Sequence, residues 1–194
     1  KIVFAMLQFI TQSLSLVLPI FIAGVCFIFI LSRDYLSFLN SPIDFGTKIR
    51  KKRLFGDNKT WRGVIIYIVF GVLTSYILNI FVQSGARDWA HPVFINEPLF
   101  VGVAFALSYV LGELINSFFK RQAGIAPGML TTSKIQLIVD NVDGMALTAI
   151  VLVFVLGVWV WNVLLALAIG FVLHCMTEIF MRKIGLKRKQ NNCR

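Results

Sequence analysis

Five long apolar segments, separated by shorter polar connections, dominate the pattern of this chain. They cover residues 12–32, 63–82, 98–119, 135–156 and 158–180. Each is close to the ~20 residues that an α-helix needs to cross the hydrocarbon core of a membrane. The pattern predicts an all-α integral membrane protein with five transmembrane helices. We expect one five-helix transmembrane domain over residues 1–186, followed by a basic C-terminal tail at 187–194.

The overall composition supports the membrane class. Of the 194 residues, 58% are hydrophobic and 14% are charged. A soluble domain of this length could not bury so much apolar surface. The three cysteines show no spacing typical of a disulfide framework or a zinc site, so we predict neither.

The basic residues predict how the chain is oriented. Lys and Arg concentrate in the connections 33–62 and 120–134 and near the C-terminus. By the positive-inside rule these regions are cytoplasmic and the N-terminus lies outside, which is the alternation that five spans require. A net charge of +10 confined to a few loops argues against a nucleic-acid surface and favours membrane lipids and small anions as partners. We therefore expect a multi-pass protein of the cytoplasmic membrane.

Polar residues recur at helical spacing near the inner end of the third segment. Glu113, Asn116, Ser117 and Lys120 follow the spacing i, i+3, i+4, i+7 and therefore share one helix face, and Arg121 follows them. Charge in an apolar segment is costly and is usually kept for function. We expect the two cations to bind phosphates, and the amide and hydroxyl to orient nucleotide or phosphate oxygens.

The fourth segment carries an acidic pair, Asp140 and Asp143, one helical turn apart. The connection between the third and fourth segments is short, so their polar faces could meet near the cytoplasmic boundary. Three carboxylates that include Glu113 would repel one another without cations. Oxygen ligands suit Mg²⁺, which often shares them with substrate phosphates. We expect Asp140 and Asp143 to hold Mg²⁺ with Glu113 in support; the alternative is an ion-pair cluster that joins the helices.

A second polar group, formed by Lys59, Thr60, Arg62 and Gly63, precedes the second segment. Free N–H groups at a helix N-terminus favour anions, and Thr60 could cap that helix. The alternative is a capped helix start with cations that reach back to the interface. Because this group and the acids lie on the same predicted membrane face, we expect a joint phosphate site.

A turn at Pro127 and Gly128 lies in the connection after the third segment. Backbone N–H groups in such a turn could approach a phosphate or a nucleotide. A Pro-Gly pair is, however, also typical of an ordinary turn.

At these residues the chain resembles the CDP-archaeol synthase family, which is related to the phosphatidate cytidylyltransferases. No single motif carries the resemblance; their combination does. The motif of phosphatidate cytidylyltransferases with His-Gly-Gly and Asp-Arg is absent, which favours the archaeol branch. The matching segments are Pro42-Ile43-Asp44-Phe45-Gly46, the run from Leu54 to Gly63, Gly112-Glu113-Leu114 with Ser117, Lys120-Arg121, Ala126-Pro127-Gly128 and Asp140-x-x-Asp143.

The resemblance implies that CMP passes from CTP to a lipid phosphate with Mg²⁺, giving a CDP-lipid for phospholipid biosynthesis and pyrophosphate. The lipid phosphate is already an anionic nucleophile, so no general base is needed. Glu113 departs from the pattern, because many relatives have Asp at that position. The lipid tail, isoprenoid ether or acyl, stays open, and so does the choice between a monomer and a homodimer.

Two other functions fit parts of the pattern. A CDP-alcohol phosphotransferase also has Asp-x-x-Asp-Gly. Its motif continues with Ala-Arg, where this chain has Leu147 and Thr148. It then has two further spaced Asp residues, which are missing here. A small transporter would need polar residues through the middle of the membrane, whereas the acids here gather at one face.

Overall fold

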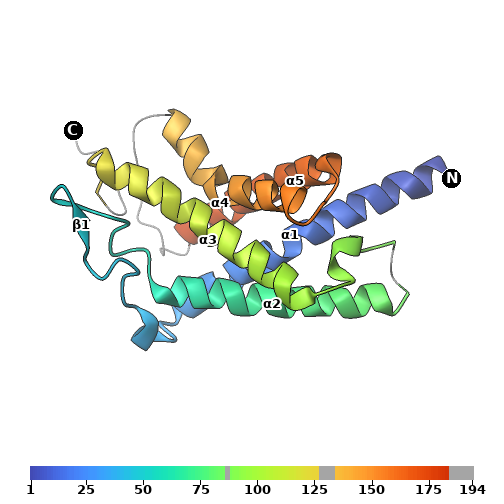
Figure 1. Ribbon diagram of the computed structural model, residues 1–194, viewed down its shortest axis with the longest axis horizontal. Helices are drawn as coiled ribbons and strands as arrows, with labels where there is room; N and C mark the ends of the chain where they lie inside the picture. Colours follow the sequence, from blue (N-terminus) through green and yellow to red (C-terminus); the bar gives the residue numbers. More distant parts are fainter. Residues whose placement is uncertain (86–87, 127–133, 184–194) are drawn as a thin grey trace.

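The computed structural model describes residues 1–85, 88–126 and 134–183 and is almost entirely helical in these ranges (Figure 1). Two short 3₁₀-helices, η1 (Ser37–Leu39) and η2 (Pro92–Phe94), lie in the connections. A small antiparallel hairpin is formed by β1 (Lys48–Ile49) and β2 (Lys52–Arg53). The long helices are α1 (Ile2–Ser32), α2 (Trp61–Gln83), α3 (Pro98–Gln122), α4 (Lys134–Phe154) and α5 (Val160–Lys183).

The five long helices pack as a closed ring. Helix α1 contacts α2 and α5, α3 contacts α2 and α4, and α4 contacts α5. In Figure 1 the first part of α1 projects beyond the other helices, and the β-hairpin lies at the opposite end of the molecule. Side chains from all five helices therefore reach the middle of the ring.

Four of the described helices are long and apolar enough to cross a membrane. They are α1, α2, α3 and the part Val160–Met181 of α5. This supports the predicted all-α membrane protein. The fourth apolar segment does form a helix, α4, but five spans and the predicted orientation stay predictions.

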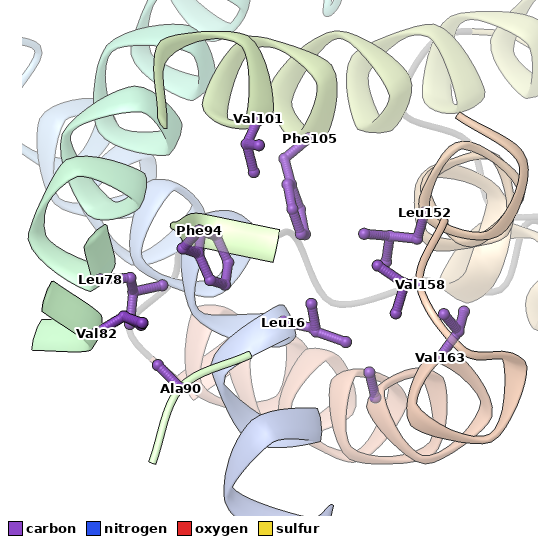
Figure 2. Close-up of a cluster of buried hydrophobic side chains, with 11 residues drawn as sticks. Leu16, Leu78, Val82, Ala90, Phe94, Val101, Phe105, Leu152, Val158 and Val163 are labelled. Atoms are coloured by element: carbon purple, nitrogen blue, oxygen red, sulfur yellow. The ribbon is translucent and has the colours of Figure 1, made fainter. Parts of the chain in front are cut away.

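The hydrophobic core occupies the end of the ring where α2 and α4 end and α3 and α5 begin (Figure 2). Phe94 of η2 is fully buried and stacks on Phe105 of α3, with ring centroids 5.9 Å apart. Leu16 of α1 and Leu152 of α4 belong to the same buried cluster. Consequently the other end of the ring, where α2 begins and α3 ends, is left for polar residues.

Buried polar side chains hold the connection between α2 and α3 onto this core. The amide of Asn79 donates to the carbonyls of Phe94, at 2.6 Å, and Ile95, at 2.7 Å. The hydroxyl of Ser15 accepts from the backbone N–H of His91 at 2.9 Å. Buried backbone groups are costly when unpaired, so these bonds fix the connection in place.

His91 should make this connection sensitive to acid. Its ring accepts a hydrogen bond from the N–H of Val93 at 3.1 Å, and burial lowers its pKa to about 4. Because the unfolded chain then binds more protons, stability falls as the pH drops from about 6.5 towards 4. We expect the unfolding temperature in detergent to fall between pH 7.5 and pH 5, with a loss on the order of 1 kcal/mol from this residue.

The matched variant is His91→Asn, which keeps an acceptor for the N–H of Val93 but does not titrate in this range. It should lose less stability than the original protein over the same pH interval. Equal losses in the two proteins would contradict the role of His91.

Candidate functional site

The segment before α2 brings Lys59 and Thr60 to the polar end of the ring. The backbone N–H of Ile43 donates to the carbonyl of Lys59 at 2.9 Å, and Pro42 pairs with Thr60 in an isolated antiparallel bridge. Thr60 is the residue before the first turn of α2, but its side chain makes no capping hydrogen bond. Its predicted position at the helix start is confirmed, whereas its capping role is not.

Lys59 reaches across to α3 and forms an ion pair with Glu113. The two side chains are each less than one-third exposed. They line a small pocket of about 90 Å³ together with Asn58, Thr60 and Gly63. This pocket therefore combines a cation, a carboxylate and the N-terminus of α2.

The predicted polar faces of α3 and α4 do meet. The amide of Asn116 donates to Asp140 at 2.8 Å and to Asp143 at 2.7 Å. The ammonium of Lys120 forms an ion pair with Asp140 at 2.7 Å. The helical spacing read from the sequence is thus enough to place these four side chains in one cluster.

Two glycines allow α3 and α4 to approach closely at this point. A Cβ built on Gly112 would lie 2.8 Å from the Cα of Gly144 and would overlap the backbone of Asp143. A Cβ on Gly144 would lie 2.7 Å from the ring of Tyr109. Small residues are used at such crossings because they let helix backbones touch. The close approach brings Asn116 within reach of both aspartates.

The other predicted cations are placed differently. Arg62 is buried and donates to Asp34 at 2.9 Å and to the carbonyl of Tyr35 at 3.2 Å, which joins the start of α2 to the end of α1. Arg121 is also buried, and it donates to the carbonyl of Ile125. Neither side chain lines the small pocket beside Lys59 or the larger cavity between α1, α4 and α5. Their predicted phosphate roles stay predictions.

Of the four remaining predicted residues, two lie in the described ranges and two do not. Ser117 is buried on α3. Gly63 lies in the first turn of α2, where it lines the small pocket. Pro127 and Gly128 lie outside the described residues.

The three predicted metal ligands are not gathered into one group. In the described ranges, no set of three or more His, Cys, Asp or Glu side chains is arranged to hold a metal ion. Glu113 is paired with Lys59, whereas Asp140 and Asp143 share the amide of Asn116. The pair of aspartates fits Mg²⁺ by itself, because Mg²⁺ usually takes one or two carboxylates and completes its shell with water and phosphate oxygens.

A larger apolar cavity of about 210 Å³ lies inside the ring, between α1, α4 and α5. Its walls are mainly aliphatic, and its polar lining includes Tyr67, Tyr109, Glu113 and His174. The rings of Tyr67 and Tyr109 stack with centroids 4.9 Å apart. Glu113 lines this cavity and also the small pocket that contains Lys59.

The two tyrosines were missed by the sequence analysis. Tyr109 precedes Glu113 by one helical turn, and Tyr67 follows Gly63 by one turn, so both lie on the faces already identified. Helical spacing could have found them. An aromatic residue in an apolar segment usually serves packing, so spacing alone does not mark it as functional.

Comparisons with known proteins test the resemblance that the sequence predicts. The family model described as CarS-like CDP-archaeol synthase matches residues 6–190. The chain belongs to the CDP-archaeol synthase family. The predicted resemblance is confirmed, and with it an enzyme of the nucleotidyltransferase class.

Individual relatives cover most of the chain at moderate identity. The CDP-archaeol synthase of Halorubrum lacusprofundi is 32% identical over 76% of this chain and 82% of its own length. That of Natronomonas pharaonis is 33% identical over 75% and 82%. The match to the Pyrococcus furiosus protein, at 37% identity, spans 45% of this chain and about half of that relative (49%). No solved structure matches.

Substitution of Gly112 tests the close helix crossing. We expect Gly112→Ala to lower the stability in detergent by about 1–3 kcal/mol, because the added methyl group meets backbone rather than a flexible side chain. The matched control is Leu111→Ala on the same helix, where the side chain is half exposed. Thermal unfolding of both variants measures the effect. An unchanged unfolding temperature for Gly112→Ala would show that the crossing is not tight.

Proposed function

We propose that this protein transfers CMP from CTP to a membrane lipid phosphate, forming a CDP-lipid and releasing pyrophosphate. One observation carries the proposal. Glu113, ion-paired with Lys59, lines both the apolar cavity inside the ring and the small polar pocket beside the start of α2. Such a junction suits a reaction between an amphipathic lipid and a polar nucleotide. The family supports the same reaction.

The apolar cavity supports the lipid part of the proposal. Its lining comes from helices that are themselves apolar enough to span a membrane, chiefly α1 and α5. Burial of each methylene group of a lipid tail contributes about 0.8 kcal/mol. A lipid phosphate whose tail lies here would present its head near Glu113 and Lys59.

The cations support binding of the phosphates. Lys59 and Lys120 each hold an ion pair with a carboxylate, and each side chain is less than one-quarter exposed. Phosphate oxygens are acceptors of the same kind as these carboxylates, so the ammonium groups can exchange one partner for the other. Asn116 keeps Asp140 and Asp143 together while Lys120 turns to a phosphate.

Asp140 and Asp143 are the residues that would hold Mg²⁺. The metal, when bound, would neutralise charge on the triphosphate. Glu113 is closer in role to Lys59 than to the aspartates, because it forms an ion pair with that lysine. We therefore assign Glu113 to the junction of the two cavities.

The reaction balances without a general base. An oxygen of the lipid phosphate attacks the α-phosphorus of CTP, the bond to the β-phosphate breaks, and pyrophosphate leaves with the electron pair. Two anions must be brought together, so positioning and cationic residues supply most of the acceleration. We place the site at the cytoplasmic face, where CTP is available for phospholipid biosynthesis.

A labelling experiment tests the reaction. The purified protein is incubated with Mg²⁺, a panel of lipid phosphates and CTP labelled at the α-phosphate. We expect label in a CDP-lipid and equimolar release of pyrophosphate. Consumption of a supplied CDP-lipid without a requirement for CTP would overturn the proposal and favour a CDP-alcohol phosphotransferase.

Replacement of Asp143 tests the aspartate pair. We expect Asp143→Asn to lower kcat/KM at least about 100-fold, because a carboxylate proposed to offset the charge of the phosphates becomes neutral. Asp88→Asn is the control, since Asp88 is exposed in the connection between α2 and α3, away from the site. Full CTP-dependent turnover by Asp143→Asn would refute the assignment.

A further inference from the structure

The connection between α1 and α2 is organised around one buried carboxylate. Asp44 is 5% exposed, and its side chain is fully buried. It accepts two hydrogen bonds from Arg53, at 2.7 and 3.3 Å. It also accepts from the backbone N–H groups of Gly46, Phe55 and Gly56 at 3.0 to 3.1 Å. Five donors thus converge on two oxygens.

This arrangement keeps Asp44 ionised. Burial alone would raise the pKa of its carboxyl, but the hydrogen bonds from Arg53 and from the three backbone amides outweigh burial and hold the pKa well below its usual range. The carboxylate joins the turn before the β-hairpin, at Gly46, to the turn after it, at Phe55 and Gly56. It therefore closes the hairpin into a fixed loop.

The same residues hold the backbone of Lys59 at both of its polar atoms. The N–H of Lys59 donates to the carbonyl of Gly56 at 3.2 Å, and the N–H of Gly56 donates to Asp44. The carbonyl of Lys59 accepts from the N–H of Ile43, the neighbour of Asp44 in the sequence. One hydrogen bond thus links the N–H of Lys59 to Gly56, which itself binds Asp44. A second links the carbonyl of Lys59 to Ile43, the residue before Asp44 in the chain.

The hairpin is also docked on the end of α3. The ammonium of Lys52 donates to the carbonyl of Gln122, and the amide of Gln122 donates to the carbonyl of Arg53 at 3.4 Å. The closed loop therefore has a fixed position relative to the helix that carries Glu113 and Lys120. A fixed loop on a fixed helix determines where the ammonium of Lys59 can lie.

We infer that Asp44 is a positioning residue that fixes Lys59 opposite Glu113. The inference rests on the proposed function for its effect on catalysis, but its structural part does not. Asp44 lines neither cavity, whereas Lys59 lines the small pocket. Asp44 therefore acts on the substrate through Lys59. A misplacement of about 1 Å in such a group can cost around 100-fold in rate.

The chain offers a matched pair of variants. Arg53 bridges Asp44 and Asp57, but the side chain of Asp44 is fully buried whereas that of Asp57 is 72% exposed. Asp44→Asn and Asp57→Asn make the same chemical change on two partners of one arginine. We expect Asp44→Asn to lower kcat/KM for CTP at least tenfold, and Asp57→Asn to stay within about twofold of the original protein.

A double-mutant cycle separates positioning from a general loss of structure. If Asp44 acts through Lys59, Asp44→Asn should cause little further loss in a Lys59→Ala background. An equal fold-loss in both backgrounds would overturn the inference, and so would unchanged activity of Asp44→Asn. If Asp44→Asn does not fold, Arg53→Gln takes its place in the cycle, because it leaves the three backbone hydrogen bonds of Asp44 intact.

A second readout is independent of catalysis. Labelling with an amine-reactive reagent, followed by mass spectrometry, measures the accessibility of each ammonium group. In Asp44→Asn the labelling rate of Lys59 should rise several-fold while that of Lys120 stays the same, since Lys120 is held by Asp140. Equal rates at Lys59 in both proteins would refute positioning. Absence of CDP-lipid formation by the original protein would refute the proposed function instead.

Discussion

The contact between Gly112 on α3 and the Asp143–Gly144 backbone on α4 determines the polar site. Two helices with ordinary side chains at this crossing would lie farther apart. Asn116, one turn beyond Gly112, could not then donate to carboxylates on the facing helix. The cluster of Asn116 with the two aspartates therefore depends on glycine at positions 112 and 144. Residues that do no chemistry themselves set the distances between those that do.

Charge compensation imposes a second constraint on the same end of the ring. Acids near apolar segments are stable when a cation or several donors face them. Glu113 has Lys59, Asp140 has Lys120, and Asp44 has Arg53. The first pair joins the connection before α2 to α3, and the second joins α3 to α4. The third closes the connection between α1 and α2 on itself. Compensation of charge therefore also holds loop and helices together. In the proposed reaction, a phosphate that binds at Lys59 or Lys120 would therefore compete with an existing carboxylate.

Helical periodicity was sufficient to predict which side chains meet where both partners lie on regular helices. The spacing of Asn116 and Lys120 and of Asp140 and Asp143 predicted a shared cluster, and the structure contains it. Arg62 could not be placed in this way. Its partners, Asp34 and Tyr35, follow the end of α1, where Asp34 has a positive φ and no simple period applies. Contacts that depend on an irregular connection are set by tertiary packing, which spacing does not encode.

In the proposed reaction, the shared position of Glu113 would let one helix bring an apolar and a polar substrate together. Helix α3 lines both cavities. One turn of it presents Tyr109 and Glu113 to the apolar cavity, and Glu113 also pairs with Lys59 at the small pocket. The carboxylate at this boundary needs a fixed cation, and the loop around Asp44 supplies one from outside the helices. The irregular connection is in this sense as much a part of the site as the helices are.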